Sequence, residues 1–225
     1  MSQGGSSGFN LLDTHIGCNV EVAKATLEWC LESRTMLAHV SSEYRAVGSR
    51  LGLRWIQDQD LDVISRFGTS ADEAGLRRVY AETGFRSDEH GAAGIVTLAD
   101  SRLIGTMQYF KAGPTIHGLE FAYAIYEASD RGCGFGAEAL ELLSALTFRE
   151  RSDCARQQLV IEISNIASWK IAERSGFLRE GLLRASGPTN QGDNYLYSRT
   201  RADWGRQRVD KSRKLSRTSP HVRSV

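Results

Sequence analysis

The segment that constrains this chain most is Arg131-Gly-Cys-Gly-Phe-Gly136, a glycine-rich loop between an apolar strand pattern and an amphipathic helix pattern. Three glycines in five residues are costly on folding, so the run indicates a backbone conformation that other residues avoid. At the start of a helix, such a loop lets main-chain N–H groups converge, and the helix dipole favours an anion there. The sequence therefore predicts a phosphate or pyrophosphate site.

Two common phosphate-binding motifs do not fit this loop. No Gly-Lys-Ser/Thr follows it, as a P-loop requires, and the G-x-G-x-x-G spacing of dinucleotide-binding folds is absent. Taken alone, the loop is also compatible with a plain flexible turn. We interpret Arg131 as a mobile positive charge beside the anion, and Cys133 as a contributor of its backbone.

Hydrophobic periodicity predicts an α+β fold with one mixed sheet, rather than a doubly wound one. After the loop, apolar residues fall on one face of a helix over 135–149, namely Phe135, Ala139, Leu142, Leu143 and Leu146. Further helices are expected at 58–67, with Asp58 as N-cap, and at 71–83 and 167–175. Strands are expected at 51–56, 94–98, 103–110, 119–126, 159–163, 177–184 and 195–200.

Composition divides the chain into three parts. Residues 49–204 carry the strand and helix patterns of one domain, whereas residues 1–48 are expected to be a partly helical or disordered extension. Residues 205–225 form a basic tail with seven Lys/Arg against one Asp, although the whole chain has a formal net charge of only +1. The tail lacks aromatic residues for base stacking, so it predicts at most nonspecific contact with RNA or the ribosome.

Nothing in the sequence predicts export or a membrane span. The opening residues 1–8 lack the basic and apolar regions of a signal peptide, and no apolar run approaches the required length of about 18 residues. The four cysteines form no CxxC pair and no metal-type grouping with histidine; they are Cys18, Cys30, Cys133 and Cys154. We therefore expect free thiols, no metal and a cytoplasmic location.

Segments in a fixed order resemble the acyl-CoA site of the GNAT acetyltransferase superfamily. They are the strand Glu120-Phe-Ala-Tyr-Ala-Ile-Tyr126, the loop followed by Ala137-Glu-Ala-Leu140, and Asn165-Ile-Ala-Ser168 with Glu173-Arg-Ser-Gly-Phe177. Three further segments resemble its ribosomal-protein N-acetyltransferase (RimJ/RimL-type) branch, namely Leu51-Gly-Leu-Arg54, Arg179-Glu-Gly181 and Asn194-Tyr-Leu-Tyr-Ser198. The resemblance covers residues 51–204.

This resemblance implies a mixed, mostly antiparallel sheet flanked by helices and splayed open between two neighbouring strands. The pantetheine arm of acetyl-CoA would lie in the gap, and a main-chain N–H of residues 124–126 would polarise the thioester carbonyl. The implied cofactor contacts are Arg131, Asn165 and the N–H groups of Ile125, Tyr126, Gly132, Cys133, Gly134, Phe135, Gly136 and Ala137. The implied reaction acetylates an amine of a protein N-terminus, an antibiotic or a small metabolite, by a monomer or homodimer.

Aminolysis of a thioester requires a neutral amine and a stabilised leaving thiolate. Glu120 is the acid in an otherwise apolar strand, and we interpret it as the general base, with Glu127 as a weaker candidate. The alternative for Glu120 is a solvated residue at the start of a strand. Tyr123 is a candidate for lining the acceptor pocket.

The second catalytic candidate comes from a departure from the family pattern. Many members have a tyrosine four residues after the serine of the downstream segment, and this chain has Ala172 there. Ser168 is the remaining candidate for donating a hydrogen bond to the thiolate. It fits equally well as the N-cap of the following helix.

Two other functions remain open at this point. The same fold can take another acyl donor, such as an aminoacyl-tRNA, whose phosphates the basic tail and Arg131 would meet. A non-catalytic module that binds acyl-CoA or RNA is the third possibility. The intact glycine loop favours the acetyltransferase.

Overall fold

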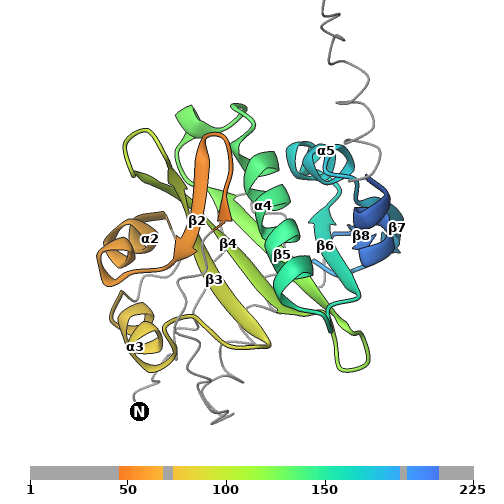
Figure 1. The fold of residues 1–225 in the computed structure, drawn as a ribbon, viewed down its shortest axis with the longest axis horizontal. Coiled ribbons are helices and arrows are strands. Elements are labelled where there is room, and N and C mark those ends of the chain that lie inside the picture. The colour runs from red at the N-terminus through yellow and green to blue at the C-terminus, as the bar shows by residue number, and fades with distance from the viewer. Residues whose placement is uncertain (1–45, 68–72, 188–191, 208–225) are drawn as a thin grey trace, which may run out of the picture.

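An eight-stranded sheet forms the centre of the molecule (Figure 1) in the computed structural model, which describes residues 46–67, 73–187 and 192–207. The strands are β1 (Ala46–Val47), β2 (Leu51–Trp55), β3 (His90–Thr97), β4 (Leu103–Lys111), β5 (Gly118–Ile125), β6 (Arg156–Glu162), β7 (Leu178–Leu183) and β8 (Asn194–Thr200). Their order is β1-β2-β3-β4-β5-β6-β8-β7, and within the described residues only β5 and β6 pair in parallel. The predicted mixed, mostly antiparallel α+β fold is confirmed.

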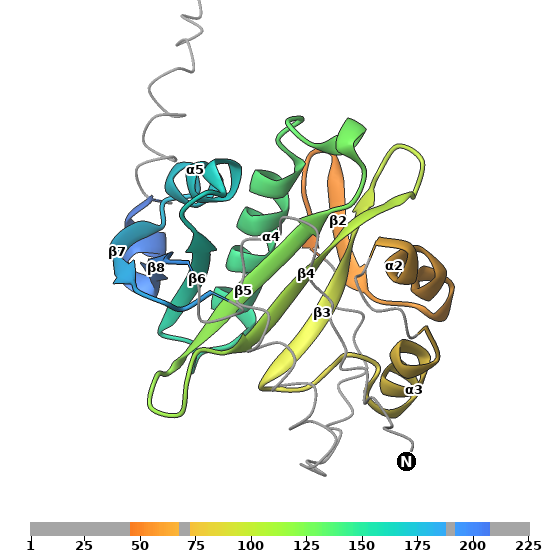
Figure 2. The same cartoon turned by 180° about the vertical axis from the view of Figure 1, so that it is seen from behind.

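Helices flank this sheet on several sides. They are α2 (Leu61–Phe67), α3 (Glu73–Thr83), α4 (Phe135–Glu150) and α5 (Ile166–Arg174), with short 3-10 turns η1 (Asp58–Asp60) and η2 (Ala128–Asp130). α4 lies across one face, α5 lies beside it near β6, and α2 and α3 lie at the β2 end, as Figures 1 and 2 show. No helix within the described ranges has the length and apolar character needed to cross a membrane.

The prediction of a helix after the glycine loop is confirmed, but the buried face is rotated about the helix axis relative to the predicted apolar face. Ala139 and Leu143 are buried as expected, whereas Leu142 and Leu146 are only partly buried. Ser144 and Thr147 occupy buried positions that an apolar pattern does not detect. They are satisfied by Gln157 of β6, whose Nε2 donates to Thr147 Oγ1 at 2.6 Å and to the Ser144 carbonyl at 2.9 Å.

The sheet opens between β5 and β6. Their paired residues end at Glu120 and Gln158, after only three pairs. Beyond that point β5 stays paired with β4 as far as Ile125, and β6 stays paired with β8 as far as Glu162. The two strands therefore diverge from Glu120 onward, which confirms the splayed sheet.

The ends of the folded domain differ slightly from the expected boundaries. Ala46 pairs with β2, inside the segment expected as an extension. Residues 201–207 form a helical turn in which Trp204 packs on Phe148 and Gln207 hydrogen-bonds Arg199 and the Gly176 carbonyl. The rest of the expected extension, residues 1–45, and the rest of the basic tail, residues 208–225, lie outside the described residues.

The expected N-cap at Asp58 is wrong. Asp58 lies inside the 3-10 turn η1, whose N-cap is Gln57. Asp60 is the acid that matters here, because its carboxylate accepts from the Gln57 N–H at 2.8 Å and from both terminal nitrogens of Arg54 at 2.6 and 2.8 Å. The buried Asp60, which has a charged partner in Arg54, therefore holds this turn, whereas Asp58 is exposed.

Candidate active site

The glycine loop adopts the special backbone that its composition predicts. Gly132 and Gly134 have φ angles of 76° and 82°, in the left-handed region that favours glycine. Gly134 is the N-cap of α4, and its carbonyl accepts from the Glu138 N–H at 3.1 Å. The N–H groups of the first helical turn, from Phe135 to Ala137, have no intrahelical partner, so they are available to an anion.

Gly136 lies where α4, α5 and β5 approach one another. A Cβ at this position would lie 3.2 Å from Ile171 Cδ1 and 3.3 Å from Tyr123 Cε2. Gly132, in contrast, has open space around its Cβ position. The surface beside Gly132 is therefore open, as the anion site predicted for this loop requires.

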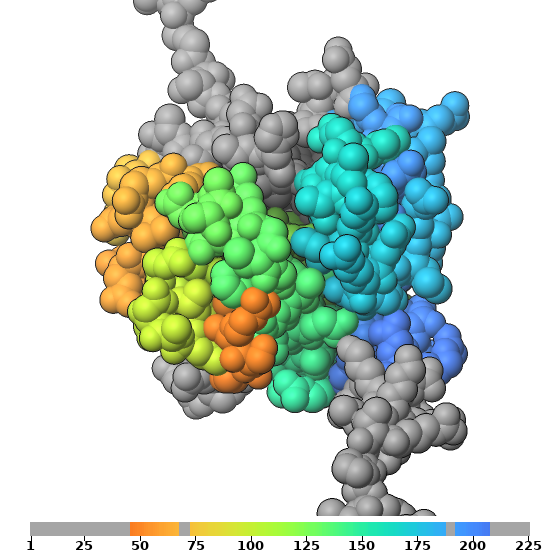
Figure 3. Space-filling view, turned by 90° about the horizontal axis from the view of Figure 1, so that it is seen from above, coloured from red at the N-terminus to blue at the C-terminus, as the bar shows by residue number. Residues whose placement is uncertain are grey.

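Figure 3 views the molecule from the loop end. The green residues around the loop and the cyan residues of α5 stand on either side of a hollow. This hollow lies over the opening between β5 and β6, where the sheet is no longer paired. The loop and α5 therefore lie on opposite sides of the opening in the sheet.

The side chain of Arg131 does not extend as a mobile charge toward the loop. Its Nε donates to the Ile125 carbonyl at 3.0 Å and its Nη2 to the Tyr126 carbonyl at 2.8 Å. The preceding residue, Asp130, is held by both terminal nitrogens of Arg102 at 2.7 and 2.9 Å. Arg131 and Asp130 thus fix the turn that leads from β5 into the loop.

Only one of the two expected N–H donors at the end of β5 faces the gap. The Tyr126 N–H donates to the Ile104 carbonyl of β4 at 2.9 Å, so it is used inside the sheet, which contradicts the prediction. Because adjacent N–H groups along a strand point in opposite directions, the Ile125 N–H is directed toward the gap. The Tyr126 ring stacks on Phe67, and burial raises the pKa of its hydroxyl to about 12.

Glu120 lies at the vertex of the gap, as the last residue of β5 that pairs with β6. Its side chain is not the solvated one of the alternative interpretation, because the residue is only 8% exposed. Burial raises the pKa of this carboxyl, while a hydrogen bond of 2.9 Å from Gln158 Nε2 acts in the opposite direction. Glu127, the weaker candidate, is exposed at the N-cap of η2.

A polar chain continues from Glu120 toward the edge of the sheet. Arg156 Nε donates to Gln158 Oε1 at 3.2 Å, and this contact orients the amide that binds Glu120. The terminal nitrogens of Arg156 bind Glu180 at 2.8 and 2.6 Å. Sequence reasoning missed Gln158 because its role depends on the register of β5 against β6.

Ser168 is not the N-cap of α5, so that interpretation is wrong. Asn165 is the cap, and its Oδ1 accepts from the Ser168 N–H at 3.0 Å. This leaves the Ser168 hydroxyl for another partner, and it lies 3.1 Å from the Tyr123 hydroxyl. Ala172, the residue at the position of the family tyrosine, is fully buried in the core.

The structure places the two catalytic candidates on opposite sides of β5. Glu120 and Tyr123 are three residues apart, and side chains of a strand alternate between its faces. Glu120 therefore contacts Gln158 on one face, and Tyr123 contacts Ser168 and α4 on the other. A base on one side and hydroxyl donors on the other suit direct attack of an amine on a thioester carbonyl that lies in the gap.

Comparisons with known proteins agree with this geometry. A family model described as an acetyltransferase (GNAT) domain matches residues 50–178. The chain is 32% identical over 139 residues to the probable N-acetyltransferase YjcK of Bacillus subtilis (strain 168), which covers 57% of this chain and 75% of that protein.

Two solved structures share the fold. AAC(6')-Ib in complex with ribostamycin and coenzyme A has a TM-score of 0.58 at 19% identity, over 71% of this chain and 98% of that chain. A putative ribosomal-protein-serine acetyltransferase from Vibrio cholerae has a TM-score of 0.55 at 20% identity, over 70% of this chain and 97% of that chain.

Proposed function

The chain belongs to the GNAT acetyltransferase family and transfers an acetyl group from acetyl-CoA to an amine, and we propose that Glu120 and Ser168 carry this reaction. The observation that supports the assignment is the position of Glu120. Its buried carboxylate lies where β5 and β6 diverge, so it borders the opening through which an amine reaches the thioester.

The loop and the end of β5 supply the cofactor contacts. The N–H groups of residues 132–137 would hold the phosphates of acetyl-CoA, and the helix dipole of α4 would favour their charge. The Ile125 N–H would polarise the thioester carbonyl, because it points into the gap. Asn165 supports this arrangement as the cap that holds α5, and with it Ser168, against the gap.

Glu120 acts as the general base for the attacking amine. A primary amine is largely protonated at neutral pH, since α-amines have pKa values of about 8 and lysine amines of about 10.4. Burial raises the pKa of Glu120, which makes its carboxylate a better proton acceptor than an exposed glutamate. Gln158 keeps the carboxylate oriented, with one hydrogen bond to Oε2.

Ser168 donates a hydrogen bond to the sulfur of the leaving thiolate. In this role the Tyr123 hydroxyl would be the donor in its 3.1 Å contact with the Ser168 oxygen, where either oxygen can donate, and it would polarise the serine hydroxyl toward the sulfur. Glu120 takes the proton from the attacking amine and returns it to solvent. CoA leaves as a thiolate and takes up a proton from solvent, so the hydroxyl pair stabilises the sulfur without giving up a proton. The phenol beside Ser168 thus comes from Tyr123 of β5. Many family members instead have a tyrosine at the position that Ala172 occupies in this chain.

We propose that the chain falls in the RimJ/RimL-type branch and that its acceptor is the α-amine of a protein N-terminus. The opening segment Leu51-Gly-Leu-Arg54, which resembles that branch, supports the proposal, and its Arg54 forms a part-buried pair with Asp60 at the turn into α2. The fold shared with the ribosomal-protein-serine acetyltransferase agrees with it.

An acceptor panel tests the proposed function. Acetyl-CoA is incubated with a peptide bearing a free α-amine, the same peptide with a blocked N-terminus and a free lysine, a polyamine and an aminoglycoside. Thiol release and product mass report transfer. We expect the free α-amine to be acetylated most efficiently and Glu120→Gln to abolish most of the activity. Preferential acetylation of the polyamine or the aminoglycoside contradicts the branch, and no thiol release with any amine contradicts the enzyme.

A further inference from the structure

Arg50 contacts the glycine loop from a distant part of the sequence. It lies in the turn between β1 and β2, and the orange residues of this turn lie against the green residues of α4 in Figure 3. Its Nη1 donates to the Cys133 carbonyl at 2.8 Å, across 83 positions of sequence. Its guanidinium also stacks over the Phe135 ring, with 4.7 Å between Cζ and the ring centroid.

Glu138 fixes Arg50 in this position. Arg50 Nε donates to Glu138 Oε2 at 3.0 Å, and the Arg50 N–H donates to Oε1 at 2.8 Å. The Leu51 N–H and the Ser49 hydroxyl donate to the same Oε1 at 3.2 and 3.1 Å. The acid in the first turn of α4 thus holds both the backbone and the side chain of Arg50.

The rest of the guanidinium faces the loop. Of its five N–H donors, two are used by Glu138 and Cys133 among the described residues. Nη2 lies 3.3 Å from the position that a Cβ on Gly134 would occupy, so it sits directly against the N-cap of α4. The side chain is half exposed, at 49%, which leaves its charge accessible to solvent and ligand.

We propose that Arg50 is a positioning residue that holds the glycine loop in its anion-binding shape and adds positive charge for the phosphates of acetyl-CoA. The inference rests on the assignment of the loop as the cofactor site. Arg131 was the expected cation, but its guanidinium is bound to the carbonyls of Ile125 and Tyr126. Arg50 instead binds the Cys133 carbonyl of the loop. The N–H groups next to this carbonyl are the ones that must face the anion.

Arginine is required here because its planar fork makes three contacts in different directions. It pairs with a carboxylate, donates to a carbonyl and stacks on an aromatic ring, which a lysine ammonium does not reproduce. Gly134 is required for the same contact, since a side chain there would press on Nη2 and also strain a φ angle of 82°.

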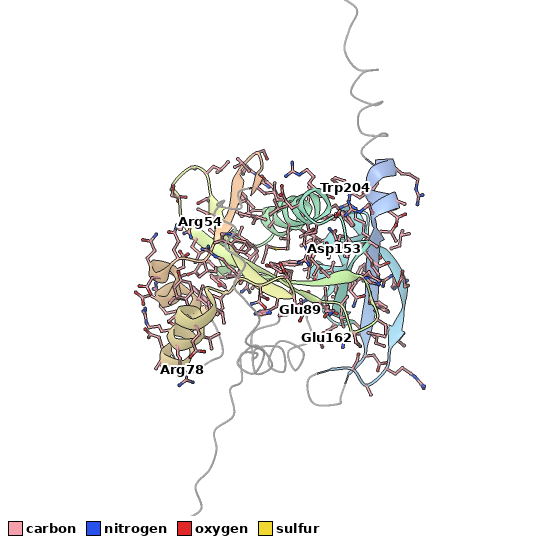
Figure 4. The ribbon with its side chains drawn as sticks, turned by 60° about the horizontal axis from the view of Figure 1, so that its bottom comes forward. Arg54, Arg78, Glu89, Asp153, Glu162 and Trp204 are labelled. Carbon is pink, nitrogen blue, oxygen red and sulfur yellow. The ribbon has the colours of Figure 1, made fainter. Side chains whose placement is uncertain are left out.

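The experiment compares Arg50→Ala and Arg50→Lys with a matched control, Arg78→Ala. Figure 4 shows Arg78 on α3, pointing away from the sheet, so the control removes one charge far from the loop. Calorimetry measures CoA binding. Steady-state kinetics use acetyl-CoA and S-acetylpantetheine, a truncated donor without the nucleotide and its phosphates. Melting temperatures are measured without cofactor.

We expect Arg50→Ala to weaken CoA binding by about tenfold or more, the equivalent of one charge-assisted contact. The KM for acetyl-CoA rises with little change in kcat, and kcat/KM for S-acetylpantetheine stays at the parent value. Arg50→Lys keeps the charge but loses the fork, so its loss is intermediate. Arg78→Ala behaves like the parent protein.

Parent-like CoA affinity in either Arg50 variant overturns the proposal, as does an equal loss with S-acetylpantetheine, which would indicate a general structural role. The lysine variant keeps the test decisive if the alanine variant does not fold. A parent protein that binds no CoA shows instead that the cofactor-site assignment has failed.

Discussion

The hydroxyl of Tyr123 lies 3.1 Å from the hydroxyl of Ser168, and this contact joins β5 to α5 across the gap in the sheet. Each of the two residues also contacts a neighbour that fixes its position. Tyr123 lies against Gly136 of α4, and the Ser168 N–H is bound by the Asn165 cap. We therefore expect the pair to act as a preorganised donor to the leaving thiolate.

Ser168→Ala should lower kcat by ~10²-fold while changing the affinity for acetyl-CoA little, because the hydroxyl acts on charge that develops in the reaction. Tyr123→Phe should give a smaller loss in the same direction, and the double variant should lose less than the product of the two. Steady-state kinetics and calorimetry measure these effects.

The same variants distinguish catalysis from helix capping. Since Asn165 is the cap, Ser168→Ala should leave the melting temperature near that of the parent, whereas Asn165→Ala should cost about 1 kcal/mol of stability. If Ser168→Ala lowers only the melting temperature and not kcat, the catalytic role is excluded.

Glu120→Gln should lower kcat/KM by ~10²–10⁴-fold at neutral pH, with most of the loss recovered at high pH where the amine is already neutral. Because burial raises the pKa of Glu120, the acid limb of the parent's pH profile should lie above the usual glutamate range near ~4.3. The matched control is Glu127→Gln, at an exposed position. If Glu127→Gln shows the loss and Glu120→Gln does not, the base has been assigned to the wrong residue.

The same raised pKa predicts a stability cost. The folded state holds the Glu120 proton at pH values where the unfolded chain has already released it. The free energy of unfolding therefore falls as pH rises from the unfolded pKa through the higher folded pKa. Above that window Glu120→Gln should be at least as stable as the parent by chemical denaturation, and a clear destabilisation there would contradict the buried, unfavourably ionised carboxylate.

Gly134→Val should abolish CoA binding, because any side chain at a φ of 82° is strained and this one also presses on Arg50. Gly136→Val should in addition lower the melting temperature, since its Cβ would meet Ile171 and Tyr123 at 3.2 and 3.3 Å. Calorimetry and thermal unfolding separate the two effects. Normal CoA binding by a folded Gly134→Val protein would place the cofactor elsewhere.

Removal of the basic tail should start after Gln207, because the Gln207 side chain binds Arg199 and the Gly176 carbonyl. We expect a chain truncated there to fold and to bind acetyl-CoA like the parent. With an acceptor carried on RNA or the ribosome, truncation should weaken binding, and each lost phosphate contact should reduce the slope of log affinity against log salt by ~0.7–0.9. With a small acceptor, kcat/KM should not change. A truncated chain that does not fold would show that residues beyond 207 pack on the domain.

Local sequence determined most of the framework. The glycines of the loop, the apolar strand that ends before it and the periodic helix after it predict the correct order of elements. Gly84 follows the last residue of α3 and has a φ of 58°, the left-handed conformation in which a glycine commonly ends a helix. These features are readable because propensity, periodicity and backbone conformation depend on neighbouring residues. The isolated acid Glu120 in an apolar strand was visible in the same way.

The tertiary structure decided which groups meet. Ser168 and Tyr123 are 45 positions apart, and Arg50 and Cys133 are 83 positions apart. Such contacts depend on the register of β5 against β4 and β6 and on how closely α4 and α5 approach the sheet. The register of β5 against β4 also pairs the Tyr126 N–H with the Ile104 carbonyl and directs the Ile125 N–H toward the gap. The sequence by itself thus determined the fold, the glycine loop and the candidate base Glu120. Only three-dimensional packing decided that Arg50 contacts the loop and that the Tyr123 hydroxyl lies beside Ser168.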